Sequence, residues 1–350
     1  MTPPPRRVAI VVVTYNSVRD VDGCFGSLAA ARLHGAEVIA IDNASTDGTA
    51  AAIRDRHPWV TLVETGANLG FAGGNGVGIR RALAAGAEWV YLLNPDTDVD
   101  PAFLEEALAV GDADPRAAAV QSLLLLHPDR DRVNTAGNEI HFLGFGYCGS
   151  YRAPRAAVGD DTREIAFASG ASVLLRAAAL REVGGLDEAL FMYQEDQDLG
   201  IRLRLAGWRA RLAPRSLVWH HYRFSRNPRK FFFLERNRYL VLAKNLRVRS
   251  LVVLAPFLAC AEFALLALAL RGGWLREKLR ADAALLSPDL RAHVRAERAK
   301  VRALRRISDR DLARWFTPAL VFEGLEGGWL PALLRAPMAL VWRVLRPLLG

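Results

Sequence analysis

The chain has 350 residues, 51% of them hydrophobic and 24% charged, which is typical of a globular protein with one large domain or two. Its three cysteines are widely spaced without a CxxC pair, so neither a disulfide framework nor a zinc site is indicated. The formal net charge is +9, but residues 271–350 hold 16 Lys+Arg against 8 Asp+Glu, so most of the excess follows the apolar run 251–270. A basic segment beside an apolar one favours an anionic membrane surface as the partner. We expect no nucleic acid as a partner.

The first hundred residues alternate between strand and helix patterns. The first apolar run is too short for a signal peptide, so we expect this part of the chain to stay in the cytoplasm. This βαβαβαβ order predicts an α/β, Rossmann-like, mainly parallel sheet with helices on both faces. The expected elements are strands at 8–13, 37–41, 60–64 and 90–93, and helices at 20–32, 48–56, 77–85 and 102–110.

An acidic turn follows the fourth of these strands. Residues 90–93 form a buried strand, which Asn94 ends at the edge of the sheet where α/β proteins bind ligands. Asp96 and Asp98 are two positions apart, so both carboxylates can point toward one hard cation. The alternative is a polar strand-to-helix turn in which Asp100 caps the next helix. The turn alone does not decide between these two interpretations.

Two further segments lie at the same predicted edge. The second strand ends at Asp42, and residues 68–78 form a glycine-rich segment after the third strand. Dinucleotide-binding glycines follow the first strand, so that fingerprint is a poor match. We expect a loop whose backbone approaches a ligand closely and tolerates positive φ, next to a helix N-terminus that can bind an anion. The alternative is a mobile loop without a ligand.

A second acidic cluster opens an amphipathic helix that ends at Gly207. Glu195, Asp196 and Asp198 fall in its first turn, where carboxylates also serve as simple caps of the helix dipole. Three acids so close together raise one another's pKa, which suits one of them to act as a general base near neutral pH. Proton abstraction and helix capping therefore both remain open from the residues alone.

Two candidates follow the second acidic cluster. His220 follows an apolar strand predicted at 209–212, and it is either a third metal ligand or a structural histidine. The helix predicted over residues 229–245 carries Arg236 and other cations, which suit a diphosphate or a solvated docking face.

The C-terminal third is apolar and basic. Residues 251–270 are long enough to cross a bilayer but contain Glu262, whose charge is costly there. We therefore favour a helix lying in or against the membrane, peripheral or monotopic, over one that spans it. Residues 329–349 repeat this character, with Trp and Arg side chains typical of an interfacial segment.

Taken in order, eight stretches resemble family 2 glycosyltransferases of the GT-A fold, most closely the rhamnosyltransferase-like branch. They run from residue 8 to about residue 245, which is two-thirds of the chain. One such motif has little specificity, whereas the ordered set is specific. The stretches are VVVTYNS, IDNASTDGT, NLGFAGGNG, LLNPDTDV, ASGASVLLR, VGGLDEALFMYQEDQDLGIRLRLAGW, the PxxxxxH that ends at His220, and ERNRYLVLAKN.

The resemblance implies a role for each matching position. The catalytic base would be Asp196, with Glu195 beside it, and the metal, Mg²⁺ or Mn²⁺, would be held by Asp96, Asp98 and His220. In relatives the metal motif begins seven residues before a Pro that opens a helix, which here makes it Asn94-Pro95-Asp96 and leaves Asp98 only a helper. The substrate-binding residues would be Thr14, Tyr15, Asn16, Asp42, Asn68, Gly70, Asn94, Gly170 and Arg236.

We therefore expect a GT-A catalytic domain at 1–245 and a helical, membrane-associated region at 246–350. The resemblance implies inverting transfer of a sugar, plausibly rhamnose, from a dTDP-, UDP- or GDP-linked donor to a cell-envelope glycan acceptor. The C-terminal third suggests that the acceptor is lipid-linked and that the enzyme works at the cytoplasmic face of the membrane. One alternative is an inactive relative that acts as a membrane assembly partner. A nucleotidyltransferase would need a glycine-rich basic loop after the first strand, which is missing here.

Overall fold

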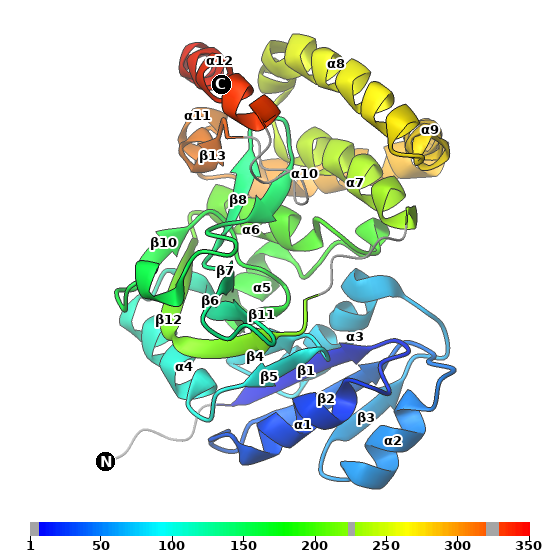
Figure 1. Cartoon of the computed structure of the whole chain (residues 1–350), viewed down its shortest axis with the longest axis vertical. Helices are drawn as coiled ribbons and strands as arrows, with labels where there is room; N and C mark the ends of the chain where they lie inside the picture. The colour runs from blue at the N-terminus through cyan, green and yellow to red at the C-terminus, as the bar shows by residue number, and fades with distance from the viewer. Residues whose placement is uncertain (1–6, 223–227, 320–328) are drawn as a thin grey trace. The chain divides into compact units, whose positions relative to one another are not determined.

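The computed structural model describes residues 7–222, 228–319 and 329–350. By its contacts the chain divides into two units, which are drawn together in Figure 1 and described separately here. Unit 1 comprises residues 1–138, 148–203 and 208–224, and unit 2 comprises residues 139–147, 204–207 and 225–350. The helix at 229–245 thus falls in unit 2. The boundary of the catalytic domain at residue 245 stays a prediction.

Unit 1 is built on a mixed sheet with the strand order β10-β12-β6-β11-β4-β1-β2-β3, to which β5 and β7 add at β12 and β6. The strands from β4 to β3 run parallel, as the alternation predicts, while β11 enters antiparallel between β4 and β6. The elements are β1 (Val8–Thr14), α1 (Val21–Ala30), β2 (Glu37–Asp42), α2 (Thr49–Arg56), β3 (Thr61–Glu64), α3 (Gly70–Ala84), β4 (Trp89–Leu93), β5 (Thr97–Val99), α4 (Phe103–Ala113), β6 (Ala117–Leu126), β7 (Val133–Thr135), β10 (Arg163–Ile165), β11 (Ser172–Arg176), α5 (Ala177–Val183), α6 (Glu195–Leu205) and β12 (Arg209–His220).

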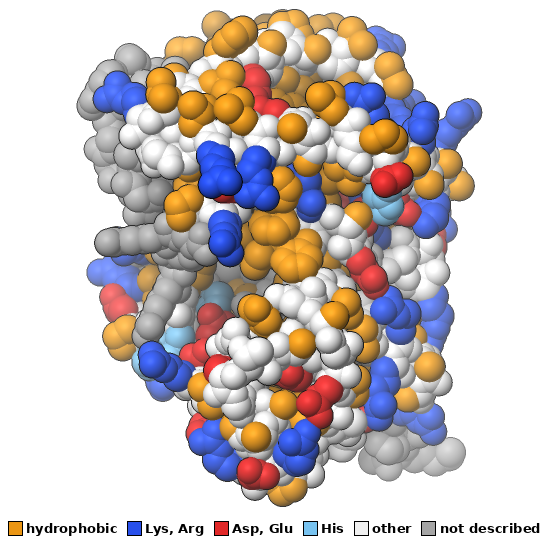
Figure 2. All heavy atoms as spheres, turned by 90° about the vertical axis from the view of Figure 1, so that its right-hand side faces the viewer, with side chains coloured by type: hydrophobic (Ala, Val, Ile, Leu, Met, Phe, Trp, Pro, Cys, Tyr) orange, Lys and Arg blue, Asp and Glu red, His pale blue; other side chains and the backbone are white. Residues whose placement is uncertain are grey.

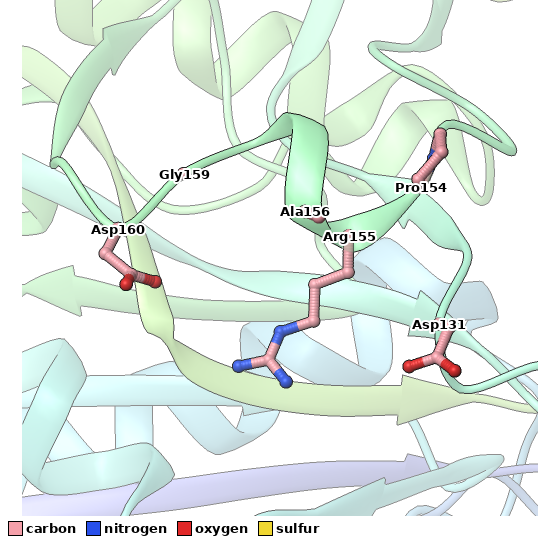
Figure 3. A pocket seen from close by; sticks show the side chains of 6 residues that line it. All are labelled: Asp131, Pro154, Arg155, Ala156, Gly159 and Asp160. Atoms are coloured by element: carbon pink, nitrogen blue, oxygen red, sulfur yellow. The ribbon is translucent and has the colours of Figure 1, made fainter.

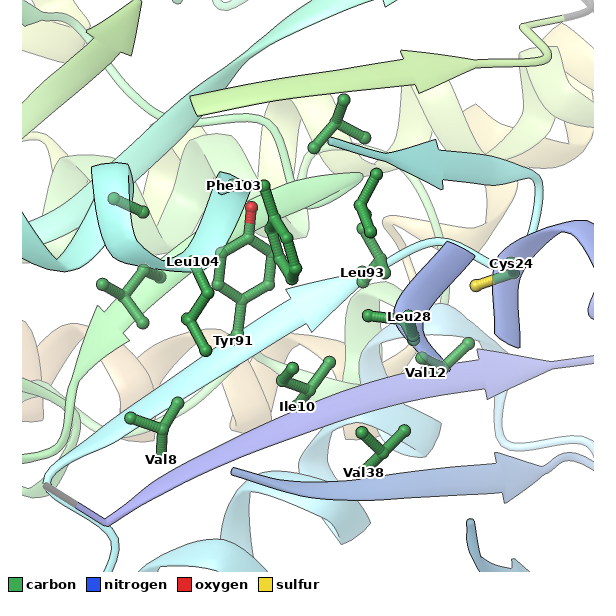
Figure 4. Packing of buried hydrophobic residues seen from close by; sticks show 14 of the residues in the cluster. Val8, Ile10, Val12, Cys24, Leu28, Val38, Tyr91, Leu93, Phe103 and Leu104 are labelled. Carbon is green, nitrogen blue, oxygen red and sulfur yellow. The ribbon is translucent and has the colours of Figure 1, made fainter. Parts of the chain in front are cut away.

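Helices cover both faces of β1, so all seven of its residues are buried. Because side chains alternate along a strand, Val8, Ile10 and Val12 share one face, where they pack with residues of α1 and α4 (Figure 4). Val11 and Val13 point to the other face, toward α3. The continuous apolar run is therefore the signature of a strand buried on both sides.

A buried hydroxyl network ties the antiparallel strands to the parallel half of the sheet. The Tyr91 hydroxyl lies 2.5 Å from the Ser122 hydroxyl and 2.7 Å from that of Ser172, and Ser122 lies 2.6 Å from Ser216. Burial raises the pKa of Tyr91 to about 12, so the phenol stays neutral. The network links β4, β6, β11 and β12 and fixes their side-by-side positions.

The glycine-rich segment is a helix, so the prediction of a loop before a helix at 77–85 was wrong. The helix α3 begins at Gly70, and two of its glycines, Gly74 and Gly78, lie against the strand β1. A Cβ at Gly78 would overlap the side chain of Val11, and one at Gly74 would overlap that of Val13. The predicted close backbone approach is therefore present, but toward the strand β1, and the small residues override the low helix propensity of glycine.

Replacing Gly78 by Ala is expected to lower the free energy of unfolding by about 1–3 kcal/mol, because the added methyl group overpacks the contact with Val11. Urea unfolding followed by circular dichroism measures this change. Gly26→Ala is the matched control, since Gly26 lies in α1 with no atom within 4 Å of a built Cβ. A Gly78→Ala protein as stable as the control would contradict the close packing.

β12 is much longer than the predicted strand at 209–212. It continues past Pro214 to His220, with a register shift between Ala213 and Leu217. Pro lacks the amide that a regular ladder needs, and the irregular register accommodates it. The extension pairs β12 with β5 and opposes Thr97 to His220, which brings two candidate segments together.

Unit 2 is mostly helical among the residues described. Its short sheet has the order β13-β8-β9. The helix predicted at 229–245 is confirmed as α7, and the apolar run lies within α8. The elements are β8 (Asn138–His141), β9 (Gly146–Cys148), α7 (Arg229–Asn245), α8 (Val248–Arg271), α9 (Leu275–Ala284), α10 (Pro288–Leu304), α11 (Asp309–Leu312), β13 (Phe316–Thr317) and α12 (Trp329–Leu345).

Candidate active site

The candidate site lies at the carboxyl end of β4. The amide of Asn94 donates to the carbonyl of Ala171 at 2.9 Å, so the turn after β4 lies beside the segment that precedes β11. The amide of Asn43 likewise donates to the carbonyl of Thr14 at 2.9 Å, which joins the ends of β1 and β2. Sheet topology thus gathers segments that are far apart in sequence at one edge.

Asp96 faces His220 across this edge. The His220 Nε2 lies 3.2 Å from the Asp96 Oδ1, and the His220 Nδ1 lies 2.9 Å from the Asn134 Oδ1. Because an amide oxygen only accepts, we assign the ring proton of Nδ1 to this bond. In the neutral imidazole, Nε2 then turns its lone pair toward the carboxylate, and a proton or a cation is needed between them.

This pair fits a divalent metal ion. Burial acts to raise the pKa of Asp96, but the hydrogen bond and the charge that His220 supplies when its Nε2 carries a proton outweigh this effect and lower the pKa. The carboxylate is therefore ionised at neutral pH, as a ligand must be. The buried Oδ1 of Asn94 has no hydrogen-bond partner among the described residues. Asp96, His220 and Asn94 thus offer donors for Mg²⁺ or Mn²⁺.

Asp98 belongs to a neighbouring cluster that the sequence did not indicate. Its Oδ2 lies 3.0 Å from the His221 Nε2 and 3.8 Å from the guanidinium of Arg130. The ring of His127 stacks on that of His221, with centroids 3.8 Å apart and planes 9° apart. Asp98, His127 and His221 could hold a metal by distance, their ligand atoms being within 4.8 Å. The lone pair of an imidazole nitrogen lies in the plane of its ring, so the lone pairs of two stacked rings run parallel and do not converge on one ion. Asp96 and His220 therefore fit a metal ion better.

Asp196 lies at the start of α6, next to the glycine before β11. Its carboxylate accepts from the amide of Gly170 at 3.2 Å and from that of Gln197 at 2.7 Å. Burial is the main influence on the pKa of Asp196 and raises it, although the two backbone donors oppose this effect. A partly exposed carboxylate with a raised pKa suits a general base.

Glu195 is buried beside Asp196, and its Oε2 has no hydrogen-bond partner among the described residues. Burial, with the charge of Asp196, raises the pKa of Glu195 well above its ordinary value. Phe191, Tyr193 and Gln194, which precede the pair, have φ of 65–66°. Left-handed backbone at non-glycine residues is costly and clusters at functional sites.

The ends of β1 and β2 carry the predicted nucleotide-binding residues. Thr14 donates to the Asp42 Oδ1 at 3.0 Å, and Asn16 accepts from the amide of Thr46 at 2.8 Å. Both oxygens of Asp42 also accept from Ser45. Tyr15 is 50% exposed, which leaves its ring open to stack on a base. Asp42 is buried, so in this structure it organises the loop.

The remaining predicted residues divide between the two units. The Oδ1 of exposed Asn68 accepts from the amide of Gly70 at 2.9 Å. Gly70 has φ 71°, and a Cβ there would crowd the carbonyl oxygen of Phe191, so this turn packs against the segment before α6. Arg236 lies in α7 of unit 2, where its Nε donates to the Asn237 Oδ1 at 2.9 Å.

A surface hollow of about 420 Å³ lies elsewhere on unit 1 (Figure 3). Arg155, Asp131 and Asp160 contribute charged side chains to its lining, together with Pro154, Ala156 and Gly159. None of the predicted site residues lines it. The candidate site therefore rests on the side chains gathered at the sheet edge, and the hollow is a separate feature.

Two solved structures share this fold. The crystal structure of GalNAc-T7 with UDP, GalNAc and Mn²⁺ superposes with a TM-score of 0.55 at 13% identity, over 69% of this chain and 48% of that one. The mannosyltransferase PcManGT from Pyrobaculum calidifontis, in complex with GDP-Man and Mn²⁺, gives 0.51 at 19% identity, over 87% and 86%. The fold is thus that of a GT-A glycosyltransferase. This chain spans about half the length of the first structure.

The sequence comparisons give the family. The model of the glycosyltransferase like family 2 matches residues 4–239, so the chain belongs to that family and is a glycosyltransferase. N-acetylglucosaminyl-diphospho-decaprenol L-rhamnosyltransferase of Mycobacterium tuberculosis is 32% identical over 237 residues, 61% of this chain and 75% of that protein. A low-salt glycan biosynthesis hexosyltransferase, Agl10 of Haloferax volcanii, is 24% identical over 200 residues, 56% of this chain and 61% of that protein. The rhamnosyltransferase-like resemblance is therefore confirmed.

Proposed function

We propose that this chain is a metal-dependent, inverting glycosyltransferase that moves a sugar, plausibly rhamnose, from a nucleotide-sugar donor to a lipid-linked glycan acceptor of the cell envelope. The observation that carries the proposal is the pairing of Asp96 with His220 at the sheet edge. Asp196 lies near this pair, because its carboxylate accepts from the amide of Gly170, and the next residue, Ala171, accepts from the amide of Asn94. The mycobacterial relative, which acts on a decaprenol-linked acceptor, supports the choice of sugar and acceptor.

In this mechanism Asp196 takes the proton of an acceptor hydroxyl, whose oxygen bonds to the anomeric carbon while the bond to the departing diphosphate breaks. One in-line displacement inverts the anomeric configuration. Mg²⁺ or Mn²⁺, held by Asp96 and His220 with Asn94 nearby, would neutralise the leaving nucleoside diphosphate. The stacked base would lie at Tyr15, and Asn16 and Asp42 would hold the loop beneath it. The reaction would occur at the cytoplasmic face of the membrane.

The donor can be identified because a bound ligand raises the free energy of unfolding of the protein. Among dTDP-, UDP- and GDP-linked sugars with Mn²⁺, the true donor at 100 times its Kd should stabilise the protein by about 2.7 kcal/mol. That change corresponds to a rise in Tm of several degrees for a chain of this size. A thermal-shift assay with and without Mn²⁺ measures this rise in Tm. Sugar transfer from the donor so identified to a prenyl-diphosphate-linked GlcNAc acceptor is then measured. Donor binding without any turnover would instead favour an inactive assembly partner.

A further inference from the structure

The helix α8 has two unlike faces. Between residues 252 and 268 its exposed residues recur at spacings of three and four, so they form one stripe along the helix, called the outer stripe here. It covers 16 residue steps, or about 24 Å at 1.5 Å per residue. None of its members is charged. The outer stripe consists of Val252, Ala255, Pro256, Ala259, Cys260, Phe263, Ala264, Ala267 and Leu268.

The opposite face of α8 is held within unit 2 by charge. Glu262 pairs with Lys278 of α9 and accepts from the hydroxyl of Tyr239 of α7 at 2.6 Å. The Lys278 ammonium is fully buried and also binds Asp282 at 2.6 Å and Glu235 at 3.3 Å. Leaving a buried charge without its partners is strongly unfavourable. These pairs therefore fix which face of α8 points inward and which points outward.

By length and composition α8 could cross a membrane. A crossing helix is surrounded by lipid or by other spanning segments, and it would carry Glu262 into the hydrocarbon away from Tyr239 and Lys278. A helix lying in the plane of the membrane surface keeps every one of these pairs and buries only the outer stripe. The charge pattern around α8 thus decides between the two orientations that its length permits.

Basic side chains flank the outer stripe. Arg247 and Arg249 are exposed at its N-terminal end, and Arg271, Arg276 and Arg280 are exposed at or beyond its C-terminal end. Figure 2 shows orange hydrophobic side chains beside blue Lys and Arg side chains over this region. Anionic lipid head groups complement that charge. A second copy packed antiparallel along the same stripe would instead bring the two arginine clusters together, which like charges disfavour.

We propose that unit 2 docks on an anionic lipid bilayer with α8 lying in the membrane plane, its outer stripe inserted at the boundary between head groups and acyl chains. The proposal rests on the proposed function for the presence of a membrane at the acceptor. To the anionic membrane surface and the in-plane helix expected from the sequence, it adds the face of α8 that meets the lipid and the ion pairs that hold the opposite face against the protein. Glu262 and Lys278 are the residues that hold α8 against the protein, and the flanking arginines contact the head groups.

Vesicle co-sedimentation of the full chain tests the docking. We expect binding to vesicles of phosphatidylglycerol and phosphatidylcholine, at least tenfold weaker binding to phosphatidylcholine alone, and weakening by salt. The double substitution Val252→Glu with Phe263→Glu should reduce binding at least tenfold. Trp59→Glu is the matched control, because Trp59 is an exposed aromatic of unit 1 and should leave binding unchanged. Equal binding by all three proteins would overturn the proposal.

A label on Cys260, which lies near the middle of the outer stripe, reports the orientation. In a Cys148→Ser background, where the other cysteine Cys24 is buried, a polarity-sensitive fluorophore should shift to the blue on anionic vesicles. Alkaline carbonate should then release the protein. Retention in the membrane after carbonate would show a spanning helix, and a dimer in solution that Phe263→Glu dissociates would show a second copy on the stripe. Either result overturns the proposal.

The docking and the catalytic proposal fail in distinguishable ways. The Val252→Glu, Phe263→Glu protein should keep wild-type transfer to a water-soluble, short-chain acceptor and a wild-type Tm, while losing vesicle binding. Vesicle binding without transfer in the wild type would remove the proposed reaction and leave the docking surface intact. Sugar transfer without vesicle binding in the wild type would remove the docking proposal and leave the proposed reaction intact.

Discussion

Replacing Asp196 by Asn is expected to lower donor-dependent sugar transfer by about 10²- to 10⁴-fold, the range that a positioned general base contributes. Asn is nearly the same size and still accepts a hydrogen bond from a backbone amide, but it cannot take a proton. Nucleotide release measured with acceptor present gives the rate. Wild-type turnover in this variant would remove Asp196 from the role of base.

Two controls separate lost chemistry from lost structure. Asp114→Asn also neutralises a half-buried carboxylate, one that pairs with Arg209 at 3.3 Å outside the site, and it should retain transfer. The pH profile of the wild type gives an independent readout. Because burial raises the pKa of Asp196, activity is present above that pKa and is lost as the pH falls through it, at a higher pH than for a solvated Asp. An acid limb at the ordinary Asp value would contradict the base assignment.

The comparison of Asp96→Ala with Asp98→Ala is the second decisive result. Asp96→Ala should lower transfer by on the order of 10³-fold, because a metal ion contributes several kcal/mol and about 1.4 kcal/mol is tenfold in rate. Asp98→Ala should cost about 10- to 100-fold, because Asp98 binds His221, which follows the proposed ligand His220 in the chain. Asp98 meets His221 at 3.0 Å, whereas Asp96 meets His220 at 3.2 Å.

Titration of the activity with Mn²⁺ identifies the cause of each loss. Removal of a direct ligand should raise the Mn²⁺ concentration needed for half-maximal activity far more than removal of a supporting residue. Each variant is the other's matched control, since both delete one carboxylate from the same turn. Equal losses and equal Mn²⁺ dependence would restore an Asp96-x-Asp98 metal motif.

The parallel strands from β1 to β4, and helices such as α1, α2 and α7, were predictable because their signals are local. An unbroken apolar run predicts the buried strand β1, and the helix α7 lies at the predicted residues 229–245. The helix α3 was predicted wrongly, since glycine propensity is a local property and its packing against Val11 is not. The length of β12 was missed for a similar reason, because the register shift past Pro214 depends on its neighbours.

The partners of the site residues could not be read from the sequence. His220 was a candidate because it follows an apolar strand, but Asn134, which fixes its ring, lies in β7. His127 stacks on His221, and only the meeting of β6 with β12 brings the two together. Such contacts join residues about ninety positions apart, and no spacing pattern encodes them.

By itself the sequence determined the family and the order of the elements along the chain, and it made Asp96 and Asp196 candidate site residues, since motifs and periodicity are local properties of the chain. Tertiary structure decided the environment of each carboxylate, which depends on neighbours brought in by the sheet. It also decided the orientation of α8, because hydropathy measures how apolar a helix is, while the pairing of Glu262 with Lys278 determines which side faces the protein.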